Sequence, residues 1–162
     1  MAASRGTEVC VVQTGSGNGS GATPNRAFAE ELLRRNRRVF RAVTRTVVPQ
    51  AEQLADDAWP EIESIVARAL AGRPRALLGQ LSLFLRVIDI VARLRGGRRF
   101  DRLSPEARAR VLGGFERSRV LLLRRGFWGL RTLALMGYYA RQDGKREIGY
   151  RATPRGWEAR TA

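Results

Sequence analysis

Apolar residues recur at helical spacing along most of the chain after a Gly/Ser-rich start. Between Arg26 and Pro49 they form one stripe, while the arginines of this segment mostly fall outside it. The members of the stripe are Phe28, Leu32, Val39, Val43 and Val47. Because proline lacks an N–H and disfavours helical backbone before it, we expect the first helix to end at Pro49.

Two further helices are predicted between Asp56 and Gly97. Asp56 or Asp57 can cap the first of them, and Gly72 ends it. The next helix follows Pro74 and closes at Gly96-Gly97. Its apolar positions repeat at i, i+4, i+7, i+11 and i+14, and they are Leu77, Leu81, Phe84, Ile88 and Val91.

The second half of the chain contains a clear helix start and the most apolar segment. Ser104 is suited to the N-cap, Pro105 to the first helical position, and Glu106 to the positive end of the helix dipole. We expect this helix to bend at Gly113-Gly114 and to run on into residues 120–139. Leucines and aromatic residues there cover nearly every face, which predicts a helix buried by neighbours on several sides.

The pattern predicts an all-α fold of about five helices packed around the central apolar helix at residues 120–139. It shows no internal repeat, and period-2 alternation appears only at residues 8–13. A single domain suits a chain of 162 residues. We expect a flexible, disordered leader at 1–25 with linker composition, a helical domain at 26–152, and a C-terminal tail at 153–162.

The charge of the chain predicts the sign of its partner but not the partner's identity. Thirty Lys and Arg residues against fifteen Asp and Glu leave a formal net charge of +15. Residues 101–162 hold fourteen of the basic residues and six of the acidic ones. Such a charge attracts nucleic acid, anionic membrane or an acidic protein surface.

The residue types present argue against an enzyme. The chain has no histidine and one cysteine, Cys10, so it lacks most side chains used in metal, haem and Ser-His sites. Gly17 to Ala22 fit a G-x-G-x-x-A dinucleotide motif, but one strand-like run cannot build the parallel sheet that this motif requires. We expect no cofactor or metal in this chain, and expect Asp89, isolated among apolar residues, to pair with an arginine.

The sequence predicts neither an export signal nor a membrane-spanning segment. Arg37-Arg38-Val39-Phe40 looks like the core of a twin-arginine signal, but Arg41, Arg45 and Pro49 interrupt the apolar stretch that should follow. No span reaches the ~20 apolar residues of a transmembrane helix. We therefore expect a cytoplasmic protein.

Arginines and aromatic residues near the end of the long helix are candidates for a partner interface. Arg110, Arg117, Arg124 and Arg131 recur every seven residues; the last two either face solvent or pair with a carboxylate or carbonyl. The aromatic residues are suited either to core packing or to an interface. The candidate interface residues are Trp128, Arg124, Arg131, Tyr138, Tyr139, Tyr150 and Trp157.

The order of these features resembles the gluconate 2-dehydrogenase subunit 3 family over residues 26–152. The segments that carry the resemblance are Thr46-Val47-Val48-Pro49, Phe100-Asp101-Arg102-Leu103-Ser104, Arg119 to Gly129, Met136-Gly137-Tyr138-Tyr139, and Ile148-Gly149-Tyr150. The double tyrosine and the later Gly-Tyr are the most specific of these. The resemblance implies that the family's motif positions correspond to Phe100, Leu103, Tyr138, Tyr139, Gly149 and Tyr150 in this chain.

The resemblance implies a non-catalytic small subunit in a hetero-oligomer with a large flavoprotein of the glucose-methanol-choline oxidoreductase class. That partner would hold FAD and perform the dehydrogenation, and this chain would stabilise, mature or escort it. Many members of the family carry a twin-arginine signal where this chain has a Gly/Ser-rich leader, so a cytoplasmic complex is expected, with co-export to the periplasm as the alternative. The alternative function, based on the charge of +15 alone, is a helical nucleic-acid-binding protein.

Overall fold

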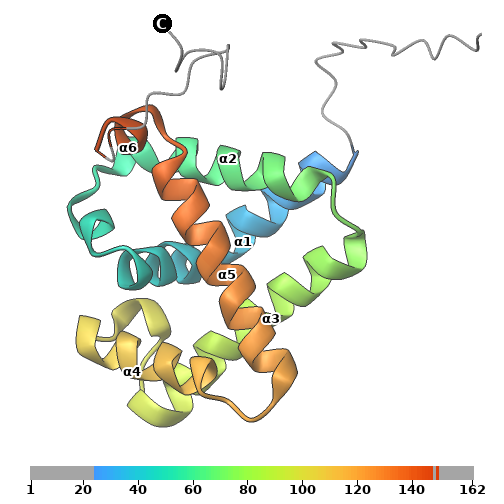
Figure 1. Cartoon of the computed structure of the whole chain (residues 1–162). Coiled ribbons are helices and arrows are strands. Elements are labelled where there is room, and N and C mark those ends of the chain that lie inside the picture. Colours follow the sequence, from blue (N-terminus) through green and yellow to red (C-terminus); the bar gives the residue numbers. More distant parts are fainter. Residues whose placement is uncertain (1–23, 148, 150–162) are drawn as a thin grey trace, which may run out of the picture.

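A computed structural model describes residues 24–147 and 149, and every regular element in this part of the chain is helical (Figure 1). The α-helices are α1 (Pro24–Val47), α2 (Trp59–Ala71), α3 (Arg75–Gly96), α4 (Pro105–Glu116), α5 (Leu121–Tyr139) and α6 (Gln142–Glu147). Short 3₁₀ turns lie at η1 (Pro49–Gln53), η2 (Asp56–Ala58) and η3 (Phe100–Arg102). The all-α prediction is confirmed. Residues 1–23 of the predicted leader and the predicted tail at 153–162 lie outside the described residues, whereas Pro24 and Asn25 belong to α1 rather than to the leader.

Helices α1 and α5 together form the centre of the domain. Helix α5 packs against the five other α-helices of the described chain, which agrees with its predicted central position. Helix α1 packs against α2, α3, α4 and α5, and its apolar face is broad. Its buried apolar residues are Ala29, Leu32, Leu33, Val39, Phe40, Ala42 and Val43. An arginine-rich helix therefore contributes a large share of the core, because its arginines occupy the opposite face.

The first half of α5 is less buried than its composition predicts. Figure 1 shows α5 crossing the domain from α6 and α2 to α3 and α4. Phe127 and Leu130 face the core, but Leu121, Leu122 and Trp128 are exposed. The prediction that neighbours cover this helix on several sides is wrong for these three residues, because the apolar residues extend around more of the helix than its neighbours contact.

Helices α4 and α5 are separate, although the sequence predicts one helix bent at Gly113-Gly114. Both glycines lie inside α4, and the chain leaves helical geometry between Arg117 and Val120. The Ser118 hydroxyl accepts a hydrogen bond from the Val120 N–H at 3.1 Å, and such local side-chain bonds compete with helical backbone bonds. This break also divides the predicted seven-residue arginine stripe between two helices.

Of the two helix N-caps predicted from the sequence, one is formed and the other is not. Ser104 caps α4, since its hydroxyl accepts a hydrogen bond from the Ala107 N–H at 3.3 Å. Neither Asp56 nor Asp57 caps α2, because both lie within the η2 turn that precedes it, and α2 has no side-chain cap. Local sequence signals thus place this helix start within a few residues but miss the intervening turn.

A buried arginine connects α4 to the chain that leaves α1. Arg108 is 7% exposed, and its guanidinium lies 2.7 Å from the carboxylate of Glu52 in η1. It also donates to the Ala42 carbonyl at 3.5 Å. A buried charge is tolerated only when it is paired, so this contact fixes how α4 packs on α1.

We expect Ser104→Ala to lower the free energy of unfolding by about 1 kcal/mol, because the Ala107 N–H loses its acceptor. Thermal unfolding followed by circular dichroism measures the change. Ser104→Asp keeps an acceptor oxygen at the same position and should unfold close to the parent protein. Equal melting temperatures for Ser104→Ala and the parent would show that this cap contributes nothing to stability.

Candidate functional site

Large apolar side chains are exposed on two neighbouring parts of the surface, the outer side of α3 and the start of α5. On α3, Leu83, Ile90 and Leu94 fall at i, i+7 and i+11, so they share one side of the helix, and Leu94 is 81% exposed. At the start of α5 the exposed residues are Val120, Leu121, Leu122 and Trp128. We call these seven residues the apolar face. Single exposed apolar residues are ordinary, whereas groups of them are typical of interaction sites.

A glycine sets the position of α5 beside α3. A Cβ atom added at Gly126 would lie 2.9 Å from the ring of Phe84, so the backbone of α5 approaches that ring closely. The Phe84 ring in turn meets Phe115 of α4 edge to face, with 5.4 Å between ring centroids. Leu122 lies one turn before Gly126, which places it on the side of α5 that faces α3. Leu122 and the exposed side of α3 therefore lie on adjacent helices, whereas Leu121 and Trp128 fall about 140–160° around α5 from Gly126, on the side away from α3.

Three of the predicted interface residues lie on the exposed half of α5. The Arg131 guanidinium carbon lies 5.1 Å from the centroid of the Trp128 ring, a cation–π distance. The same guanidinium lies 3.8 Å from the carboxylate of Glu116, so Arg131 has a carboxylate partner within the domain. Arg124 lies one turn before Trp128 and is exposed. Trp128, Arg131 and Arg124 thus share an accessible surface.

The predicted tyrosines lie closer to the core. Tyr138 is 2% exposed, which favours core packing over a direct partner contact for this residue. The Arg141 guanidinium carbon lies 4.4 Å from the Tyr138 ring centroid, and Arg141 donates to the Tyr138 carbonyl at 3.1 Å. Tyr139 is half-buried and meets the Tyr138 ring edge to face. Tyr150 and Trp157 lie outside the described residues.

The other positions singled out in the sequence have structural roles. Phe100 is fully buried, and its N–H donates to the Asp89 carboxylate at 3.0 Å. Arg93 pairs with the same carboxylate at 2.7 Å, which confirms the prediction that Asp89 has an arginine partner. Leu103 is half-buried against the core. Gly149 has a φ of 64°, in the left-handed region that glycine adopts most easily.

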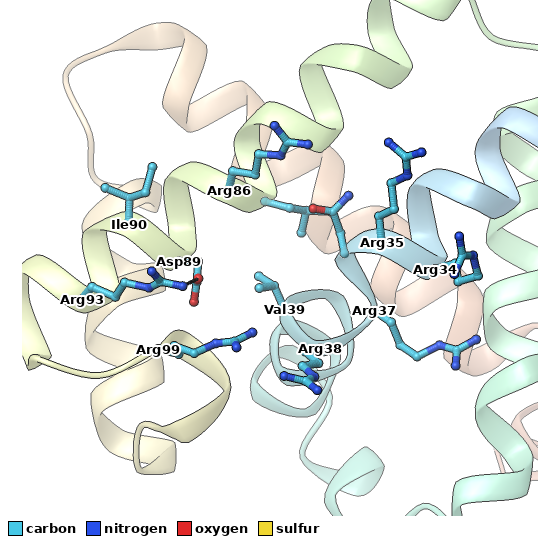
Figure 2. A pocket seen from close by; sticks show the side chains of 12 residues that line it. Arg34, Arg35, Arg37, Arg38, Val39, Arg86, Asp89, Ile90, Arg93 and Arg99 are labelled. Atoms are coloured by element: carbon cyan, nitrogen blue, oxygen red, sulfur yellow. Dashed lines mark hydrogen bonds and ion pairs between the residues drawn. The ribbon is translucent and has the colours of Figure 1, made fainter.

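A groove between α1 and α3 gathers seven arginines, and the sequence interpretation missed it (Figure 2). Its volume is about 570 Å³, and Asp89 is the one carboxylate among its lining residues. The arginines that line it are Arg34, Arg35, Arg37 and Arg38 from α1, Arg86 and Arg93 from α3, and Arg99 from the loop after α3. The signal in the sequence was the spacing of Arg86 and Arg93, which are seven residues apart and share one side of α3. This spacing indicates a groove only when the position of α1 beside α3 is known. We call this feature the arginine groove.

Most of the groove's arginines already have an acidic neighbour. Glu31 accepts from Arg34 and Arg35 at 2.7 and 2.6 Å, and these hydrogen bonds lower the pKa of Glu31 to about 2. Because the pKa falls on folding, this pairing stabilises the fold above the ordinary glutamate pKa and is lost as the pH falls toward 2. Arg37 pairs with Glu63 at 3.1 Å, and Arg99 lies 3.4 Å from Asp101.

Two arginines of the groove are different, because they form no ion pair or hydrogen bond with any described residue. Arg38 belongs to α1 and Arg86 to α3, so each of the two helices contributes one unpaired guanidinium (Figure 2). Both side chains are exposed. The arrangement can bind an anionic group on either wall of the groove.

Within residues 24–147 and 149, no three His, Cys, Asp or Glu side chains lie close enough together to hold a metal ion. None of the helices in that part of the chain is both long and apolar enough to cross a membrane. No protein-family model matches the chain, and no curated protein or solved structure shows significant similarity to it.

Proposed function

We propose that this chain is a non-catalytic accessory subunit that binds the large subunit of a flavin-dependent oxidoreductase through the apolar face. The observation that carries the proposal is the exposure of seven large apolar side chains on adjacent helices. Removing a large apolar side chain from water contributes about 1.5–3 kcal/mol when its burial is complete. A partner that covers most of these residues would therefore gain enough free energy for a stable complex.

The rim of the apolar face also suits a protein partner. Trp128 is half-exposed and bears Arg131 on its ring, and tryptophan and arginine are the residue types most enriched at binding hot spots. A chain without histidine and with one cysteine has few side chains for redox chemistry of its own, which suits a binding role.

The resemblance to the gluconate 2-dehydrogenase subunit 3 family supplies the class of partner. It implies a glucose-methanol-choline flavoprotein that holds FAD, in a hetero-oligomer with this chain. We place the complex in the cytoplasm, with co-export to the periplasm as the alternative. Tyr139 is half-buried near the end of α5, and in this proposal it supports the helix that presents Trp128.

We expect the tagged full-length chain to capture a large flavoprotein from its native cell and to give a yellow eluate. Leu94→Ser/Leu122→Ser should reduce the amount captured at least about tenfold, since two apolar contacts are lost. Mass identification and the flavin absorption of the eluate measure both results.

The control is Phe28→Ser/Leu77→Ser, which removes two exposed apolar residues outside the apolar face. It should capture as much flavoprotein as the parent chain. Equal losses for the two double variants would overturn the assignment of the apolar face. A nuclease-sensitive, salt-labile eluate without flavin would overturn the accessory-subunit proposal in favour of nucleic-acid binding.

A further inference from the structure

We infer that the arginine groove is a second binding site, which takes an acidic segment of a partner protein rich in aspartate and glutamate. The inference rests on the proposed function, because it assumes that the partner is a protein docked on the apolar face. The arginine groove would bind this partner through charge, whereas the apolar face would bind it through burial of apolar side chains.

The arginines of the groove outnumber the carboxylates that contact them. Seven arginines line it, and only four carboxylates touch them, namely Glu31, Glu63, Asp89 and Asp101, of which Glu63 also pairs with Arg41. Arg38 and Arg86 form none of these pairs and stay available. An arginine guanidinium presents donors in a planar fork that fits a carboxylate with two parallel hydrogen bonds.

The shape of the groove favours a chain segment over a small molecule. Sites for small ligands enclose most of the ligand surface. Six of the seven arginines that line this groove are exposed, and the lining side chains come from two helices and the loop after α3, so the groove does not enclose a ligand (Figure 2). An extended segment can place successive carboxylates near Arg38 of α1 and Arg86 of α3, the two arginines without an acidic partner among the described residues, so that several weak contacts act together.

The lining residues disfavour nucleic acid as the occupant. Val39, Leu85 and Ile90 provide the apolar part of the groove, and no aromatic side chain lines it. Proteins that bind single strands without sequence preference stack bases on aromatic rings, and this groove offers none.

The groove and the apolar face meet at one residue, which supports a shared partner. Ile90 lines the groove and is also 54% exposed on the outer side of α3. Arg86 lies four residues before it and Arg93 three residues after it, so both arginines flank Ile90 on the helix surface. A protein that covers Ile90 and Leu94 would bring its neighbouring residues to the edge of the groove.

The test uses the purified full-length chain and a fluorescent synthetic peptide of glutamate and aspartate, with binding followed by fluorescence anisotropy at low ionic strength. Arg38→Glu/Arg86→Glu should weaken binding at least about tenfold, because two unpaired cations become anions. Arg68→Glu/Arg110→Glu makes the same change of charge at two exposed positions on α2 and α4, and should weaken binding less than about threefold. Circular dichroism confirms that both variants fold.

Three results would overturn the inference. In the first, the peptide does not bind. In the second, the two double variants weaken its binding equally, which would mean that only net charge matters. In the third, a single-stranded oligonucleotide or inorganic tripolyphosphate binds the groove more tightly than the peptide and depends on Arg38 and Arg86, which would make the groove a phosphate site.

The two proposals can fail separately. The peptide experiment contains no flavoprotein, so its failure leaves the capture experiment unaffected. Capture of a flavoprotein that depends on Leu94 and Leu122, together with no peptide binding, would overturn the groove alone. Peptide binding that depends on Arg38 and Arg86, together with no flavoprotein in the eluate, would overturn the proposed function alone.

Discussion

Gly137→Val should lower the free energy of unfolding by about 3 kcal/mol, at the upper end of the usual cost of overpacking a core. Helix α5 crosses α2 at this glycine. A Cβ atom there would lie 2.9 Å from the Cγ2 atoms of both Ile62 and Val66, and 3.6 Å from the Ile62 carbonyl oxygen. Because Ile62 and Val66 are β-branched and fully buried, they have few other rotamers, and the helices must separate to admit the new side chain.

Gly129 provides the control within the same helix. A Cβ atom added at Gly129 meets nothing within 4 Å, so Gly129→Ala should stabilise the protein by about 0.5–1 kcal/mol through helix propensity. Urea unfolding followed by circular dichroism measures both variants. If Gly137→Val unfolds at the same urea concentration as the parent, α5 and α2 do not make this close contact.

The helices that the sequence predicts well are those with local signals at their ends. The third helix was expected to close at Gly96-Gly97, and α3 does end there, with Gly97 at a φ of 64° and its N–H donating to the Arg93 carbonyl. The start of α4 depends on Ser104 and Pro105, which act on their own backbone. Such signals need no knowledge of the rest of the fold.

Features that depend on packing between helices could not be predicted in this way. The close crossing at Gly137 requires that α2 lie against α5, and nothing near Gly137 in the sequence indicates its neighbour. The burial of Tyr138 has the same origin. Its position at the end of an apolar helix fits either a surface or a core residue, and only its packing against the core formed by the other helices decides between them.

The same distinction explains which parts of the candidate site were found. Trp128, Arg124 and Arg131 are close in sequence on one helix, so their common exposure follows from helical spacing. The arginine groove combines arginines of α1 with Arg86 and Arg93, which lie about fifty residues later. No periodicity within either helix predicts that these two arginine-bearing surfaces face each other.

Trp59→Ala should lower the free energy of unfolding by about 4 kcal/mol, because Trp59 is fully buried and its removal leaves a large cavity. The guanidinium carbons of Arg41 and Arg45 lie 5.2 and 5.1 Å from the Trp59 ring, so the substitution also removes two cation–π contacts between α1 and α2. Guanidinium chloride unfolding measures the loss. A variant that folds too poorly for that measurement is replaced by Trp59→Phe, which should show a smaller loss in the same direction.

Trp128→Ala is the matched control, and it should show the opposite pattern. Trp128 is 48% exposed, so its removal should change the free energy of unfolding by less than about 1 kcal/mol. It should nevertheless reduce the capture of the flavoprotein about tenfold or more, since a tryptophan at the rim of the apolar face is a candidate hot spot. Full capture by Trp128→Ala would remove this residue from the interface. A large loss of stability would show instead that the ring supports the packing of α5 rather than binding a partner.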